Sequence, residues 1–124
     1  MLGQAWLSAL FVHAFDLEKM VAFYRDTLGL EVYFEEPGQC TFFRTTGGGP
    51  SLALYAGREP GQVGCNHWFV MFDVPDLDAT VSALQARGVG AGPIQAVPYG
   101  RMVLFSDPEG NIIEVREPVM TPAE

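Results

Sequence analysis

Imidazole and thiol side chains, which often do acid–base or metal chemistry, are few, because the chain carries two histidines and two cysteines. His13 and His67 are the imidazoles, and each is a candidate proton-transfer group or metal ligand. A histidine beside an apolar segment is also often purely structural, and both interpretations stay open. Cys40 and Cys65 lack the spacing of a metal site, so we expect free thiols in a reducing compartment, with a disulfide as the alternative.

Two other kinds of chemistry find no support in the sequence. The segment Gly47-Gly48-Gly49 lacks a following Lys and Ser or Thr, so it predicts a hairpin loop rather than a phosphate cradle. No serine has the context of a nucleophile elbow, and those considered are Ser8, Ser51, Ser82 and Ser106.

Composition predicts one compact, acidic domain. The chain has 124 residues, 48 % of them apolar, which is enough for a core. The formal charge of -8 argues against nucleic acid, whose phosphates need a basic surface. The same charge is compatible with a cationic or neutral ligand, although on composition solubility alone is the better explanation.

The apolar residues are distributed as in a protein of the cytoplasm. No apolar run reaches the 18 or more residues that a membrane span needs. The first nine residues have no basic stretch ahead of an apolar block, so a secretory signal peptide is not expected. We therefore predict a cytoplasmic protein without membrane contact.

Two segments with the same pattern predict two helices. One runs from Asp16 to Gly29 and the other from Asp76 to Gly88, so the capping residues lie 60 positions apart. Each has Asp at the N-cap, acid in the first turn, apolar residues at helical spacing and a terminal Gly. Such a repeat indicates a duplicated unit.

Each predicted helix lies between one β-rich segment and a group of short strands, giving the order βαβββ twice. Turns rich in Gly, Pro and Asp separate the strands. We predict an α+β protein with a first module at 1–55, a linker at 56–64, a second module at 65–117 and a loose tail at 118–124. A ferredoxin-like sandwich is the alternative, but it has fewer strands. The predicted strands are 6–15, 31–34, 40–45, 52–55, 67–74, 94–97, 102–106 and 112–116.

With these motifs, the sequence resembles the vicinal oxygen chelate superfamily, which includes glyoxalase I, extradiol dioxygenases and bleomycin resistance proteins. The resemblance rests on Asp16-Leu17-Glu18, Phe23-Tyr24-Arg25-Asp26-Thr27-Leu28-Gly29-Leu30, Pro75-Asp76-Leu77-Asp78 and Asp107-Pro108-Glu109-Gly110-Asn111, and it covers nearly the whole chain. It implies two βαβββ modules whose curved mixed sheets surround a shared cleft. It also implies a homodimer, with the modules paired within one chain or by swapping.

The resemblance also implies where metal ligands would stand. Metal-dependent members place them on the first and last strands of each module, and here those positions hold Ala9, Ala53, Phe69 and Glu114. Only Glu114 has a donor atom, whereas a catalytic divalent metal needs about three protein ligands. We therefore expect no metal cofactor.

Strand alternation then predicts which side chains line the cleft. If Ala9 and Phe69 face it, so do the residues two positions along in each strand. That set is an aromatic and apolar surface with a few ionisable groups, typical of small-molecule pockets. Its apolar members are equally well explained as core. The predicted ligand-binding residues are Phe11, His13, Tyr55, His67, Phe69, Met71, Asp73 and Glu114, with Arg116 on the same face.

Three functions remain open. We favour a metal-free binding protein of the bleomycin-resistance type, which holds a small aromatic or cationic compound such as an antibiotic. The alternative is an enzyme of lyase, isomerase or dioxygenase type, either metal-independent with Glu114 and His13 as acid–base groups or with a metal site in another register. The third is a domain with a degenerate cleft that acts only through dimer contacts.

Overall fold

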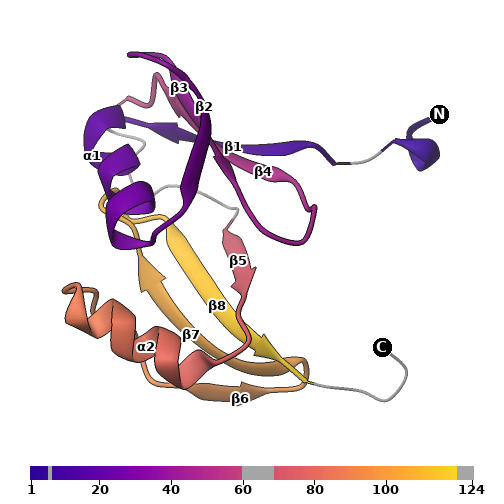
Figure 1. Ribbon diagram of the computed structural model, residues 1–124, viewed down its shortest axis with the longest axis vertical. Helices are drawn as coiled ribbons and strands as arrows, with labels where there is room; N and C mark the ends of the chain where they lie inside the picture. The colour runs from indigo at the N-terminus through magenta and orange to yellow at the C-terminus, as the bar shows by residue number, and fades with distance from the viewer. Residues whose placement is uncertain (6, 60–68, 120–124) are drawn as a thin grey trace. The chain divides into compact units, whose positions relative to one another are not determined.

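The computed structural model describes residues 1–5, 7–59 and 69–119, and it consists of two compact units (Figure 1). The units are Met1–Val63 and Gly64–Glu124. Each holds one four-stranded sheet and the helix that follows its first strand. No helix in the described part of the chain has the length and apolar character needed to cross a bilayer. The module and linker boundaries expected above, and the cleft shared by the two sheets, stay predictions.

The first unit has the order of elements that the sequence predicted. Its sheet runs β1-β4-β3-β2, with β1 parallel to β4 and the other neighbours antiparallel. A short helical turn at Leu2–Gln4 (η1) precedes the sheet, and the turn Phe23–Thr27 (η2) is π-helical. The elements are β1 (Ala9–Ala14), α1 (Leu17–Ala22), η2, β2 (Glu31–Glu36), β3 (Cys40–Arg44) and β4 (Ser51–Ala56).

The second unit repeats this topology. Its sheet runs β5-β8-β7-β6, with β5 parallel to β8 and antiparallel pairing elsewhere. The elements are β5 (Val70–Asp73), α2 (Leu77–Ala86), β6 (Gln95–Val97), β7 (Gly100–Ser106) and β8 (Ile112–Pro118). The predicted α+β class with two mixed βαβββ sheets is thus confirmed, and the predicted strand ends differ from these by a few residues.

The helices begin where the sequence placed their caps. An oxygen of Asp16 accepts the backbone N–H of Lys19 at 3.1 Å, and Asp76 accepts that of Ala79 at 3.0 Å. Each bond satisfies one of the free N–H groups at a helix start, which is worth about 1 kcal/mol. The first helix differs from the prediction at its end, because η2 closes with a bond from the N–H of Leu28 to the carbonyl of Phe23.

One face of each sheet is covered by its helix. In the first unit Tyr24 is fully buried, and its ring lies 6.0 Å from that of Phe43 on β3. In the second unit α2 contacts β7 and β8 and buries Leu77 completely. Burying one large apolar side chain stabilises the folded state by about 1.5–3 kcal/mol, so these helix-covered faces form the core.

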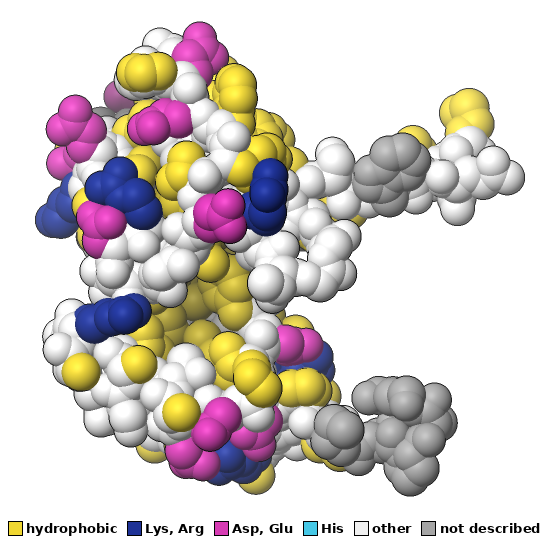
Figure 2. Space-filling model, viewed as in Figure 1, with side chains coloured by type: hydrophobic (Ala, Val, Ile, Leu, Met, Phe, Trp, Pro, Cys, Tyr) yellow, Lys and Arg dark blue, Asp and Glu magenta, His cyan; other side chains and the backbone are white. Residues whose placement is uncertain are grey.

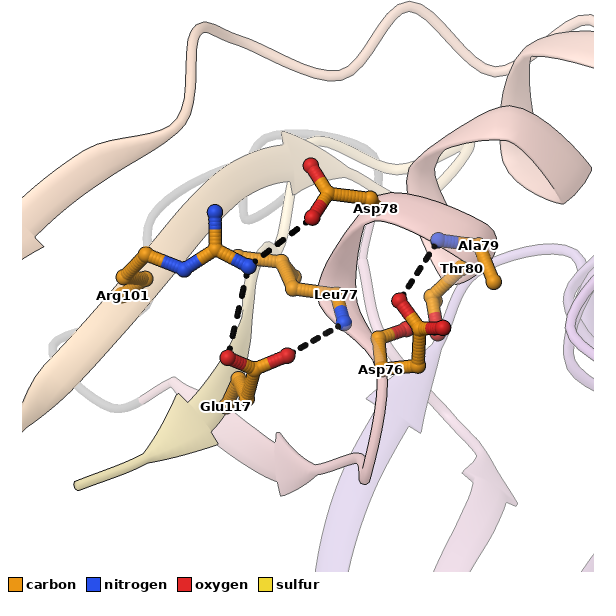
Figure 3. A network of polar contacts seen from close by, with 7 residues as sticks. All are labelled: Asp76, Leu77, Asp78, Ala79, Thr80, Arg101 and Glu117. Atoms are coloured by element: carbon orange, nitrogen blue, oxygen red, sulfur yellow. Dashed lines mark hydrogen bonds and ion pairs between the residues drawn. The ribbon is translucent and has the colours of Figure 1, made fainter. Parts of the chain in front are cut away.

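A polar network fixes the start of α2 against its sheet (Figure 3). An oxygen of Glu117 on β8 accepts the backbone N–H of Leu77 at 3.0 Å. Arg101 on β7 donates to Asp78 at 3.0 Å and to the other Glu117 oxygen at 3.3 Å. Strands β7 and β8 are therefore tied to the first turn of α2, and Arg101 lies on the helix-covered side of the sheet.

Gly100 is required by the close pairing of β7 with β8. It has φ +142°, and a Cβ there would collide with the carbonyl oxygen of Glu117. We expect Gly100→Ala to lower the free energy of unfolding by about 2–4 kcal/mol, measured by urea denaturation, because both backbone strain and a clash oppose it. Gly90→Ala is the control, since nothing lies within 4 Å of its added Cβ. Equal stability of the two variants would contradict the register of β7 and β8.

Candidate functional site

The face of the first sheet opposite α1 carries the residues predicted to bind a ligand. Register partners on neighbouring strands point to the same face of a sheet. Phe11 on β1 is paired with Ala53 on β4, which is paired with Phe42 on β3. His13 is paired with Tyr55. The structure therefore brings Phe11, His13 and Tyr55 together on this open face, as the alternation predicted.

Aromatic rings on the open face form a connected group, the aromatic cluster, made of Phe11, Tyr33, Phe34, Phe42 and Tyr55. Phe42 is at its centre, with ring centroids 5.5 Å from Phe11, 6.1 Å from Tyr33 and 5.7 Å from Phe34. The ring of Tyr55 lies 6.1 Å from Phe11. Most of these pairs are edge-to-face, which is a favourable arrangement of ring quadrupoles.

The aromatic cluster is exposed although it is apolar. Phe11 is 54 % exposed, Phe34 52 % and Tyr33 43 %. Leaving large rings in water costs the burial free energy that core residues gain, so a contiguous exposed group is a common sign of a binding surface. On each unit, hydrophobic side chains reach the surface, with acidic side chains scattered among them (Figure 2).

Sequence reasoning missed three members of the cluster. Phe42 follows from the alternation within β3 and could have been found by extending the same count. Tyr33 and Phe34 could not, because the register of β2 shifts between Val32 and Phe34, so that these neighbouring rings both reach Phe42. A β-bulge of this kind breaks strict alternation and has no clear sequence signal.

Polar groups border the cluster. The hydroxyl groups of Tyr33 and Ser51 are hydrogen bonded at 2.8 Å. The guanidinium carbon of Arg44 lies 5.1 Å from the centroid of the Tyr33 ring, within the range of a cation–π contact. His13 lies at the other end, with its ring 6.0 Å from that of Tyr55.

The open face of the second sheet has a corresponding register and different side chains. Met71 on β5 is paired with Glu114 on β8, which is paired with Leu104 on β7. Phe69 directly precedes β5 and is 57 % exposed. His67, also predicted as a ligand-binding residue, lies outside the described residues. The remaining predicted residues of this unit, Met71, Asp73 and Glu114, share one face.

Asp73 is engaged in an ion pair across the β5–β8 pair. Its two carboxylate oxygens accept hydrogen bonds from Arg116 at 2.8 and 2.6 Å. The hydrogen bonds from Arg116 lower the pKa of Asp73. Arg116 also donates to the carbonyl of Tyr99 at 3.4 Å and lies 5.7 Å from the centre of its ring. Both Asp73 oxygens are thus used within the protein, and the ion pair holds Arg116 in place.

Glu114 is the buried acid of this open face. It is 4 % exposed, and within the described residues its Oε2 atom has no hydrogen-bond partner. A buried polar atom without a partner costs the folded state about 1–3 kcal/mol. In functional proteins such an atom calls for an explanation, and an unoccupied partner position for a ligand is one.

The residues present do not fit a divalent metal at the positions that the resemblance marks. Ala9 and Ala53 offer only methyl groups and Phe69 an apolar ring, so Glu114 is the single donor among the four. Within residues 1–5, 7–59 and 69–119, no three His, Cys, Asp or Glu residues lie close enough together to bind a metal ion. The alternative acid–base pair, Glu114 and His13, falls on different units, so its convergence stays a prediction.

Comparison with known proteins gives the chain clear relatives. The family model described as Glyoxalase/Bleomycin resistance protein/Dioxygenase superfamily matches residues 6–115. TnmS3, an antibiotic binding protein from Streptomyces sp. CB03234, is 29 % identical with a TM-score of 0.79, over 93 % of this chain and 97 % of that one. Biphenyl-2,3-diol 1,2-dioxygenase 3 of Rhodococcus globerulus is 32 % identical over 110 residues, which are 81 % of this chain.

The curated relatives are longer than this chain. The match covers 56 % of the Rhodococcus dioxygenase. It covers 21 % of the CFP32 glyoxylases of Mycobacterium bovis and Mycobacterium tuberculosis, which are 44 % identical over 55 residues. The chain therefore spans between about a fifth and about half of the length of these relatives.

The ion pair of Asp73 predicts an acid-dependent loss of stability. Since Arg116 lowers the pKa of Asp73, the stabilisation is complete above the unfolded-state pKa near 4 and is lost as the pH falls through the folded-state value. At pH 7 we expect the free energy of unfolding of the wild type to exceed that of Asp73→Asn by about 0.5–1 kcal/mol. The difference is small because the ion pair is partly exposed. Urea unfolding from pH 7 to pH 2.5 should show this difference shrink, and a constant difference would contradict the pairing.

The unpartnered oxygen of Glu114 predicts that its removal stabilises the protein without ligand. Glu114→Met keeps the side-chain length and removes the buried polar atoms, so we expect the free energy of unfolding to rise by about 1–3 kcal/mol. Glu117→Met, three residues along β8, is the matched control. It should destabilise, because both Glu117 oxygens are hydrogen bonded. A loss of stability in Glu114→Met of the same size as in Glu117→Met would show that Glu114 has a partner.

Proposed function

The chain belongs to the Glyoxalase/Bleomycin resistance protein/Dioxygenase superfamily, and on this premise we propose that it binds a small aromatic or cationic compound of antibiotic type, without a metal. The aromatic cluster on the open face of the first sheet is the observation that carries the proposal. The fold alone does not decide between binding and catalysis, since one fold supports many functions.

The chemistry of the aromatic cluster favours a flat ligand. Exposed rings that already contact one another edge to face offer a ready surface on which a planar compound can stack. Rings also attract cations through their quadrupoles, and a protein of net charge -8 raises the local concentration of cationic compounds. A preformed apolar surface with a few polar groups at its border is the usual composition of a small-molecule site.

Two relatives favour different functions for this surface. TnmS3 is an antibiotic binding protein, and its similarity extends over nearly the whole of both chains, which favours binding without catalysis. Bleomycin-type resistance by sequestration would follow if the ligand is toxic. The positions that would hold a metal carry Ala9, Ala53 and Phe69, and this also favours binding alone.

The Rhodococcus dioxygenase favours the second candidate, an enzyme. In this chain, such an enzyme would use Glu114 and His13 as acid–base groups, or a metal bound in another register. Metal analysis of the purified protein after incubation with iron, manganese, nickel and zinc separates the two functions. Stoichiometric tight metal would support the enzyme and overturn the metal-free proposal.

The proposal includes the setting in which the protein acts. We propose a cytoplasmic homodimer with no nucleic-acid or membrane partner. A buried free Cys40 suits a reducing compartment, the acidic charge opposes phosphate binding, and the family resemblance implies the dimer. Light scattering coupled to size-exclusion chromatography measures the molar mass in solution and so tests the homodimer directly.

Removing one ring of the aromatic cluster should weaken ligand binding. We expect a compound from a panel of bleomycin, daunorubicin and 9-aminoacridine to raise the melting temperature, with a stabilisation of about 2.7 kcal/mol at 100 times its Kd. Phe11→Leu should weaken that compound's affinity by about threefold to tenfold, because the lost ring contact is worth about 0.5–1.5 kcal/mol. Titration calorimetry measures the affinity.

Phe23→Leu is the matched control, since Phe23 contacts Tyr24 beside the helix and belongs to no part of the aromatic cluster. Its ligand affinity should equal that of the wild type. Equal weakening by the two substitutions, or no shift with any aromatic compound, would contradict the proposed function.

A further inference from the structure

The orphaned oxygen of Glu114 indicates what the ligand must carry. Glu114 is held on the open face of the second sheet between Met71 and Leu104, its register partners on the neighbouring strands. Both of these apolar side chains are partly exposed, at 45 % and 36 %, whereas Glu114 is almost fully buried. A carboxylate with apolar neighbours and an unused acceptor atom is set up to receive a donor from outside the described protein.

The cation next to Glu114 on the same face of β8 is engaged elsewhere. Arg116 lies two residues along β8 on the same face, and its charge and that of Glu114 interact. All three guanidinium nitrogens of Arg116 are already used, two of them on Asp73 and the third on the carbonyl of Tyr99. In this arrangement Arg116 donates to Asp73 and to Tyr99 and makes no hydrogen bond to Glu114 Oε2.

A metal ion does not supply the missing partner either. The other positions at which the superfamily would place ligands hold Ala9, Ala53 and Phe69, and one carboxylate alone is far short of the ligands that a divalent ion needs. The partner must therefore bring its own hydrogen-bond donor and need no further protein ligand.

We propose that Glu114, on the open face of the second sheet, accepts a charge-assisted hydrogen bond from the protonated amine of an aromatic compound, and that it thereby selects such compounds. This inference rests on the proposed function and narrows its ligand class from aromatic compounds to aromatic compounds with a cationic amine. A hydrogen bond with an ionised partner is about twice as strong as one between neutral groups. A cationic amine adds Coulomb attraction to the Glu114 carboxylate, a neutral hydroxyl does not, and an anion would be repelled.

Three probes that share the naphthalene ring system and differ in charge test the proposal. They are 2-naphthylmethylamine, 2-naphthalenemethanol and 2-naphthoate, which are cationic, neutral and anionic at pH 7. We expect the wild type to bind the amine about tenfold more tightly than the alcohol, and the naphthoate most weakly. Naphthyl fluorescence or calorimetry gives the three affinities.

Substitution of Glu114 then assigns the preference to this residue. Glu114→Gln keeps the shape and removes the charge, and it should reduce the preference for the amine to less than about threefold. Glu114→Met provides a second test if the amide variant folds poorly, and it should abolish the preference. Glu35→Gln removes an exposed carboxylate from β2 of the other unit and should leave the preference unchanged.

The outcomes separate this inference from the proposed function. If the probes bind but the wild type does not prefer the amine, or if Glu114→Gln and Glu114→Met retain the preference, the role of Glu114 is wrong and the aromatic site stands. If Glu35→Gln lowers the preference as much as Glu114→Gln, general surface charge explains it and the role of Glu114 is again wrong. If none of the probes binds to any variant, the proposed function itself is overturned.

Discussion

The parallel pairing of the first strand of each module with its last is the constraint on which the rest of the structure depends. It brings together residues that lie about forty positions apart in the chain, such as Phe11 with Ala53 and Asp73 with Arg116. Because side chains alternate along a strand, this one register also decides which residues lie under the helix and which remain on the open face. A shift by one residue would exchange the two sets.

Most of the fold could be predicted from the sequence because its signals are local and repeated. Capping aspartates, helical spacing and turn residues defined the helices and strands, and alternation placed Phe11 and Tyr55 on the same face. Contacts that depend on the register between strands could not be predicted. The bulge that brings both Tyr33 and Phe34 to Phe42 is of this kind.

The pairing of the ionisable groups could not be predicted either. The alternation of side chains along a strand placed Asp73, Glu114 and Arg116 on one face, but it did not indicate which of them would form an ion pair. The structure resolves this through the β5–β8 register, which sets Asp73 directly beside Arg116 and leaves Glu114 beside Met71. Asp73 and Glu114, which the sequence could not distinguish, therefore differ in the structure. Both oxygens of Asp73 accept hydrogen bonds, whereas Glu114 has an oxygen without a partner among the described residues.

The residues at the four positions where the resemblance implies metal ligands follow one physical logic. With Ala9, Ala53 and Phe69 at three of them, no metal is expected to balance the charge of the buried Glu114 carboxylate. An apolar residue at position 114 would then be the more stable choice, because a buried unpaired oxygen costs the folded state free energy. Stability alone thus does not account for Glu114, whereas the proposed role as a buried acceptor for a ligand donor would.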